Sequence, residues 1–107
     1  MNSEKDRAAR DVIDAKADFE MALSNKRRYP LDEFRGFVRA ARRYIGLAAG
    51  DTLIHRNVAG EISGLADYLK LERKRVPRNV LVEADRLHCL LFSGYDPYFE
   101  GDEPPGL

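Results

Sequence analysis

Apolar residues recur along this chain at intervals of three and four, the spacing that places side chains on one face of an α-helix. The first such stripe consists of Ala8, Val12, Ala15, Phe19 and Ala22, widened by Ile13, Met21 and Leu23. Ser3 is suited to cap this helix, because Asp6 follows three residues later, as in a capping box with Asp in place of Glu. The spacing predicts a helix over residues 3–25, a stretch without Gly or Pro.

A second amphipathic stretch follows a break at Pro30, which fixes its own φ and disfavours helix in the residue before it. Its apolar positions are Phe34, Phe37, Val38, Ala41, Ile45 and Ala48. Asp32 is expected to be the N-cap residue. Gly50 is expected to end the helix, since glycine readily takes the left-handed conformation.

A third stripe consists of Ile54, Val58, Ile62, Leu65 and Leu69. Asp51 is expected to cap this helix directly after Gly50, so the second and third helices should form a tight antiparallel hairpin. Gly60 and Gly64 lie one turn apart in the third helix, and each costs about 1 kcal/mol relative to alanine. Two interpretations remain open: another helix of the chain approaches closely there, or the glycines form a dimer contact.

A fourth helix is expected to open at Pro77 or Asn79 and to end at Ser93-Gly94. Its apolar positions are Val80, Ala84, Leu87 and Leu91, with Leu81, His88, Leu90 and Phe92 beside them. The last fourteen residues hold three Gly, three Pro, four acidic and three aromatic residues, and no periodicity survives in them. This composition predicts an extended segment.

Four helices joined by short loops predict an all-α fold, a small antiparallel four-helix bundle with an extended acidic-aromatic C-terminal tail. The length of 107 residues suits one domain, so the expected organisation is a helical bundle over residues 1–93 and a tail over residues 94–107. The main alternative is a three-helix core in which the first helix packs on a partner chain.

The formal net charge is zero, but it hides an asymmetric distribution of charge. The central part of the chain is basic and the last 21 residues carry four acidic groups without Lys or Arg. The basic residues form three concentrations: Lys26, Arg27 and Arg28; Arg35, Arg39, Arg42 and Arg43, on the face of the second helix opposite its apolar stripe; and Arg73, Lys74, Arg75 and Arg78. In an up-down bundle the first and third clusters lie at one pole, where they could bind a phosphate-rich ligand. Alternatively, these cations only complement the negative ends of helix dipoles.

Motifs for catalysis are scarce in this sequence. It contains no glycine-rich phosphate loop, GxSxG, HExxH or CxxC, and we predict no catalytic residues, no metal and no cofactor. The pairs Asp51/His55 and Asp85/His88 have helical spacing, but a di-metal bundle uses more carboxylates. The single Cys89 excludes an internal disulfide and suits a reducing compartment. With no signal peptide or membrane span in the sequence, we expect a cytoplasmic protein that does not use a membrane.

Three functions remain open. The first is a non-catalytic protein–protein interaction or regulatory module that acts as a homodimer. Its partner-binding residues would be Tyr95, Tyr98, Phe99, Gly60 and Gly64. The second is a nucleic-acid-binding regulator that uses the basic residues, with the acidic tail as a mask. The third is a small enzyme. The tail aromatics have an alternative role, which is to cover the open end of the bundle core.

Overall fold

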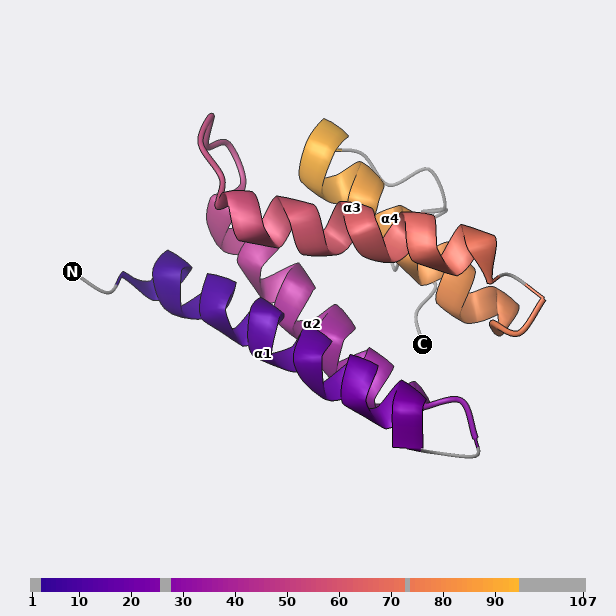
Figure 1. Cartoon of the computed structure of the whole chain (residues 1–107). Coiled ribbons are helices and arrows are strands. Elements are labelled where there is room, and N and C mark those ends of the chain that lie inside the picture. Colours follow the sequence, from indigo (N-terminus) through magenta and orange to yellow (C-terminus); the bar gives the residue numbers. More distant parts are fainter. Residues whose placement is uncertain (1–2, 26–27, 73, 95–107) are drawn as a thin grey trace.

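The fold is an all-helical bundle in the computed structural model, which describes residues 3–25, 28–72 and 74–94. Within these ranges the chain forms α1 (Glu4–Asn25), α2 (Leu31–Ala48), α3 (Arg56–Leu71) and α4 (Arg78–Ser93). α1 and α2 form one antiparallel hairpin, α3 and α4 form another, and the two hairpins pack together (Figure 1). The predicted four-helix bundle is therefore confirmed, with α1 packed on its own chain. The predicted tail lies outside the described residues from position 95 onward.

Local sequence signals set three of the helix ends. The Ser3 hydroxyl accepts a hydrogen bond from the Asp6 backbone N–H (3.0 Å), and the Ser3 backbone N–H donates to Asp6 Oδ2 (3.3 Å). This is the capping box that the sequence predicts. Gly94 follows α4 with a φ of 67°, a left-handed conformation that glycine adopts without steric cost. Gly50 likewise has a φ of 83° just after α2.

The start of α2 differs from the prediction. Pro30, not Asp32, is the N-cap residue, and no side chain caps this helix within the described part of the chain. The Pro30 carbonyl accepts the Phe34 N–H (3.0 Å), so the helix begins immediately after the proline. Asp32 instead lies in the first turn, where its carboxylate accepts from Arg35 (3.2 Å).

The predicted tight hairpin between α2 and α3 is wrong, because seven residues (49–55) connect these helices. Asp51 does not cap α3; its carboxylate accepts a hydrogen bond from Lys5 of α1 (2.9 Å). Lys5 also donates to the Leu53 carbonyl (2.7 Å), which holds the connection against the start of α1. As a result α2 and α3 lie diagonally across the bundle, and each packs on α1 and on α4.

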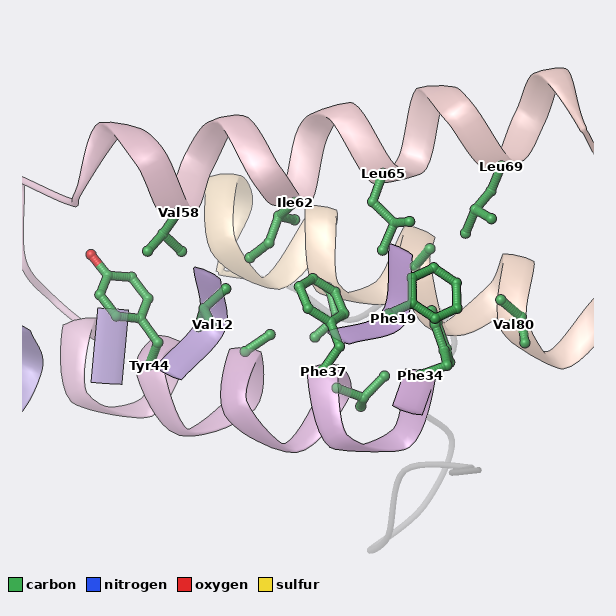
Figure 2. Close-up of a cluster of buried hydrophobic side chains, with 14 of the residues drawn as sticks. Val12, Phe19, Phe34, Phe37, Tyr44, Val58, Ile62, Leu65, Leu69 and Val80 are labelled. Atoms are coloured by element: carbon green, nitrogen blue, oxygen red, sulfur yellow. The ribbon is translucent and has the colours of Figure 1, made fainter. Parts of the chain in front are cut away.

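The core fills the space along this diagonal. Figure 2 shows Val58, Ile62, Leu65 and Leu69 of α3 pointing towards the rings of Tyr44, Phe37 and Phe34 on α2. All seven side chains are buried, and the predicted apolar stripes of both helices supply six of them. Met21, which the sequence places beside the α1 stripe, is 66% exposed. Within the described ranges, no helix is long and apolar enough to cross a membrane.

Candidate functional site

An open groove of about 510 Å³ runs between α1 and α3. From α1 it is lined by the side chains of Lys16, Phe19 and Leu23, among others, and from α3 by Gly60, Gly64 and Tyr68. Lys16 Nζ donates to Glu61 Oε2 (2.6 Å) and so joins the two helices by an ion pair. The groove thus has apolar side chains along its walls and an ion pair that links its two helices.

Gly60 and Gly64 leave the α3 backbone bare in this groove. Both residues are exposed, and a Cβ built on either would have no described atom within 4 Å apart from its own helix backbone. The interpretation that a neighbouring helix of the same chain approaches these glycines is therefore wrong. Their role in a dimer contact remains a prediction.

A second hollow is lined by residues of the α1–α2 and α3–α4 connections. Both connections lie at the same end of the bundle (Figure 1). Arg28 of the first connection and Arg75 of the second line the same pocket of about 370 Å³. Up-down connectivity predicts this meeting of the two basic clusters. We call Arg28, Lys74, Arg75 and Arg78 the basic pole; all four are exposed and form no ion pair with the described residues. Lys26, Arg27 and Arg73 of the predicted clusters lie outside those residues.

Two tyrosines also line the pocket at the basic pole. The Tyr29 hydroxyl is buried and has no hydrogen-bond partner among the described residues. Burial of the phenol, with a smaller contribution from neighbouring Tyr68, raises the pKa of Tyr29 to about 12. Tyr68 lies where the pocket and the α1/α3 groove meet, and it is 46% exposed. The two hollows therefore adjoin at this residue.

The predicted basic face of α2 does not form one surface. Arg35 pairs with Asp32 of its own helix, and Arg43 lies 3.5 Å from Glu4 and 3.4 Å from Asp11 of α1. Arg42 turns to α4, and Arg39 is exposed without an ion pair in the described residues. Three of the four cations are thus already neutralised by carboxylates of the same chain.

The partner of Arg42 belongs to a buried ionic cluster that sequence patterns did not reveal. Arg42 Nη2 donates to both carboxylate oxygens of Glu83, at 3.1 and 2.9 Å, and Arg86 Nη1 donates to Glu83 Oε1. The side chains of Glu83 and Arg86 are only 3% and 1% exposed. We call these three residues the α2–α4 ionic cluster. It joins the two hairpins through charges placed inside the bundle.

His55 is held by groups on two helices. Its Nε2 lies 2.7 Å from Asp6 Oδ1, and its Nδ1 lies 2.9 Å from the Tyr44 hydroxyl. The His55 backbone N–H donates to the same hydroxyl oxygen (2.7 Å). All these groups are satisfied when Nε2–H donates to Asp6 and Tyr44 O–H donates to Nδ1. This arrangement fixes the end of the α2–α3 connection at the N-cap of α3.

The two Asp/His pairs considered for a metal do not converge. Asp51 pairs with Lys5, and His55 bonds to Asp6 and Tyr44. The ring of His88 packs against Phe92 on α4, with centroids 4.8 Å apart. Over residues 3–25, 28–72 and 74–94, no three His, Cys, Asp or Glu side chains gather closely enough to hold one metal ion.

The contact between Asp6 and His55 predicts acid sensitivity. The hydrogen bond from His55, followed by that from the Ser3 backbone, lowers the pKa of Asp6 below its ordinary 3.8. A carboxyl group whose pKa is lower in the folded than in the unfolded state stabilises the protein at pH values above its unfolded-state pKa. This contribution is lost as the pH falls through the folded-state pKa. We expect the midpoint temperature of wild-type unfolding to decrease as the pH is lowered below about 4. In Asp6→Asn this decrease should be smaller.

The matched control is Asp18→Asn, which neutralises an exposed carboxylate of α1 that has no ion pair in the described residues. Circular dichroism melts from neutral pH to about pH 2 measure both variants. If both variants weakened the pH dependence of the midpoint temperature equally, a specific role for the Asp6–His55 contact would be contradicted.

No family model, no curated protein and no solved structure matches this chain. What it does must be inferred from its own side chains. Of the residues predicted to bind a partner, Gly60 and Gly64 lie in the open groove, whereas Tyr95, Tyr98 and Phe99 lie outside the described residues.

Proposed function

We propose that this chain is a non-catalytic interaction module that acts as a homodimer through the exposed face of α3. The observation that carries the proposal is the stripe of Gly60, Gly64, Tyr68 and Leu71 along that face. Each of these residues is exposed, and Leu71 is 86% exposed. We call them the α3 stripe.

A second copy is the partner that suits the α3 stripe best. Two-fold dimers use the same patch on both subunits, so α3 could cross α3 of the other copy at the bare glycine backbone. The fold itself offers little reason for the glycines, because each costs about 1 kcal/mol in a helix and no described side chain occupies the space beside it. At such a crossing, Tyr68 and Leu71 would bury apolar surface that is now exposed.

The direct test is a Gly64→Leu variant studied by sedimentation equilibrium. The added side chain enters open space in the monomer but obstructs a close helix crossing. We expect the wild type to dimerise and Gly64→Leu to remain monomeric. At concentrations where both are monomers, the variant should be more stable by about 0.5–1 kcal/mol, because leucine favours helix more than glycine.

Gly46→Leu is the matched control, since Gly46 is an exposed glycine within α2 with equally open surroundings. It should dimerise like the wild type. A monomeric wild type, or a Gly64→Leu protein that dimerises as tightly as the control, would contradict the proposal.

A cytoplasmic location is part of the proposal. The sequence has one cysteine, which suits a reducing compartment in which proteins do without disulfides.

A further inference from the structure

The cations of the basic pole differ from Arg35, Arg42 and Arg43 of α2 in lacking carboxylate partners among the described residues. Arg28 and Arg75 come from different connections yet line one pocket; Lys74 precedes Arg75 in the same connection, and Arg78 is the first residue of α4. One carboxylate, that of Glu72, lines the same pocket. Two arginines therefore line this pocket with a single acid, and the excess positive charge is available to an anionic ligand.

The start of α4 adds to this positive charge. Its N-cap residue is Pro77, no side chain caps the first turn within the described residues, and no acidic residue stands in that turn. The first backbone N–H groups of a helix lack partners within the helix, and the helix dipole makes this end positive. Arg78 is the first residue of this helix, and Arg75 lies in the connection just before it.

The aromatic residues at the pole indicate which kind of anion it would bind. The ring of Tyr68 is 46% exposed at the edge of the pocket, so one face of a base could stack on it. The buried Tyr29 hydroxyl lacks a partner among the described residues and can donate a hydrogen bond to a ligand. Proteins that bind single strands combine cations along the backbone with aromatic side chains under the bases.

We propose that the basic pole binds single-stranded nucleic acid, with phosphates on Arg28, Lys74, Arg75 and Arg78 and a base on Tyr68. This goes beyond homodimer formation and does not depend on it, but both use Tyr68, so the dimer and the nucleic-acid complex should exclude one another. A duplex keeps its bases stacked inside and cannot use the tyrosine ring. An acidic peptide would use the cations but gains nothing comparable from Tyr68.

The test uses the full chain with fluorescently labelled oligothymidylate, a duplex of equal length and heparin, measured by anisotropy over a range of salt concentrations. Four phosphate contacts predict a slope of log affinity against log salt of about −2.8 for a single strand. Arg28→Ala/Arg75→Ala should reduce the slope to about −1.4. Arg39→Ala, which removes an equally exposed arginine from α2, should leave it unchanged.

The contribution of stacking is tested separately. Tyr68→Ala should weaken oligothymidylate binding about 5- to 150-fold, and Tyr68→Phe should restore it. Neither change should affect heparin binding. Circular dichroism verifies that each variant is folded.

Three results would overturn the proposal. The first is a salt slope that is the same in the double arginine variant and the wild type. The second is equal weakening by Arg39→Ala. The third is a Tyr68→Ala protein that binds oligothymidylate normally, which would indicate a surface for polyanions in general. If Gly64→Leu abolishes the dimer while oligothymidylate binding persists, the two proposals are separated.

Discussion

Glu83→Gln should lower the free energy of unfolding by about 3–5 kcal/mol, the usual cost of removing one partner of a buried ion pair. The substitution keeps the size of the side chain but removes its charge. Arg42 and Arg86 would then face a neutral amide inside the bundle, where the Arg86 side chain is only 1% exposed. Domains are stable by about 5–15 kcal/mol, so this variant would lose a large part of its stability.

Urea unfolding followed by circular dichroism measures this loss as a shift of the midpoint. The control is Glu61→Gln, which breaks the more exposed ion pair with Lys16 in the same chemical way. That pair is part-buried, with side chains 12% and 34% exposed, so its loss should cost less than the loss of charge in the more deeply buried cluster. If Glu83→Gln cost no more than Glu61→Gln, the α2–α4 ionic cluster would not stabilise the fold.

Replacement of the whole α2–α4 ionic cluster should behave differently from loss of its carboxylate. A buried ion pair must offset the cost of removing charges from water, and apolar residues of similar volume avoid that cost. The triple variant Arg42→Met/Glu83→Leu/Arg86→Met should therefore remain within about 1 kcal/mol of the wild type or exceed it. That outcome would show that the carboxylate compensates the two arginines, and that the position itself tolerates apolar packing.

The helices could largely be predicted from sequence, because their signals are local. The Ser3 and Asp6 capping box, the left-handed Gly50 and Gly94, and the apolar spacing each involve residues a few positions apart. The start of α3 could not be predicted in this way. His55 is fixed there by Asp6, 49 positions earlier, and this contact exists only once the chain has folded.

The burial of the charged residues Glu83 and Arg86 could not be predicted from sequence for a related reason. A pattern of apolar and polar positions assigns charged residues to the surface, since isolated buried charges are costly. Glu83 and Arg86 face the interior because they compensate each other and Arg42 across α2 and α4. Arg42 was predicted on the outer face of α2 for the same reason. Only the three-dimensional pairing distinguishes it from Arg39.

The candidate site was predicted in part. The pole formed by Arg28 and Arg75 follows from connectivity, since the first and third helices of an up-down bundle end on the same side. The place of Tyr68 beside this pocket did not follow. One exposed tyrosine has no spacing pattern, and its position between the groove and the basic pole depends on the packing of α1 against α3.

Phe34→Ala should destabilise the fold by about 3–5 kcal/mol through loss of core packing. The Phe34 ring is fully buried and lies edge-on to Phe19 of α1, with centroids 5.4 Å apart. Its centroid is 6.4 Å from that of Phe37. Truncation would leave a cavity where α1 and α2 meet, and the surrounding rings could close it only in part. Phe34 lines neither the groove nor the pocket at the basic pole, so the effect should be confined to stability.

Thermal melts and urea titrations at one protein concentration measure the effect, because the proposed dimer would make stability depend on concentration. The midpoint temperature should fall by about 4–8 °C for each kcal/mol. Leu71→Ala, which truncates a leucine that is 86% exposed, should change the stability of the monomer by no more than about 0.5 kcal/mol. Equal effects in the two variants would mean that the Phe19–Phe34 contact is not part of a packed core. If Leu71→Ala instead lowers stability only at concentrations where the protein dimerises, the lost stability comes from the contact of the α3 stripe in the dimer. In the monomer the Leu71 side chain is almost fully exposed, so its truncation removes little packing.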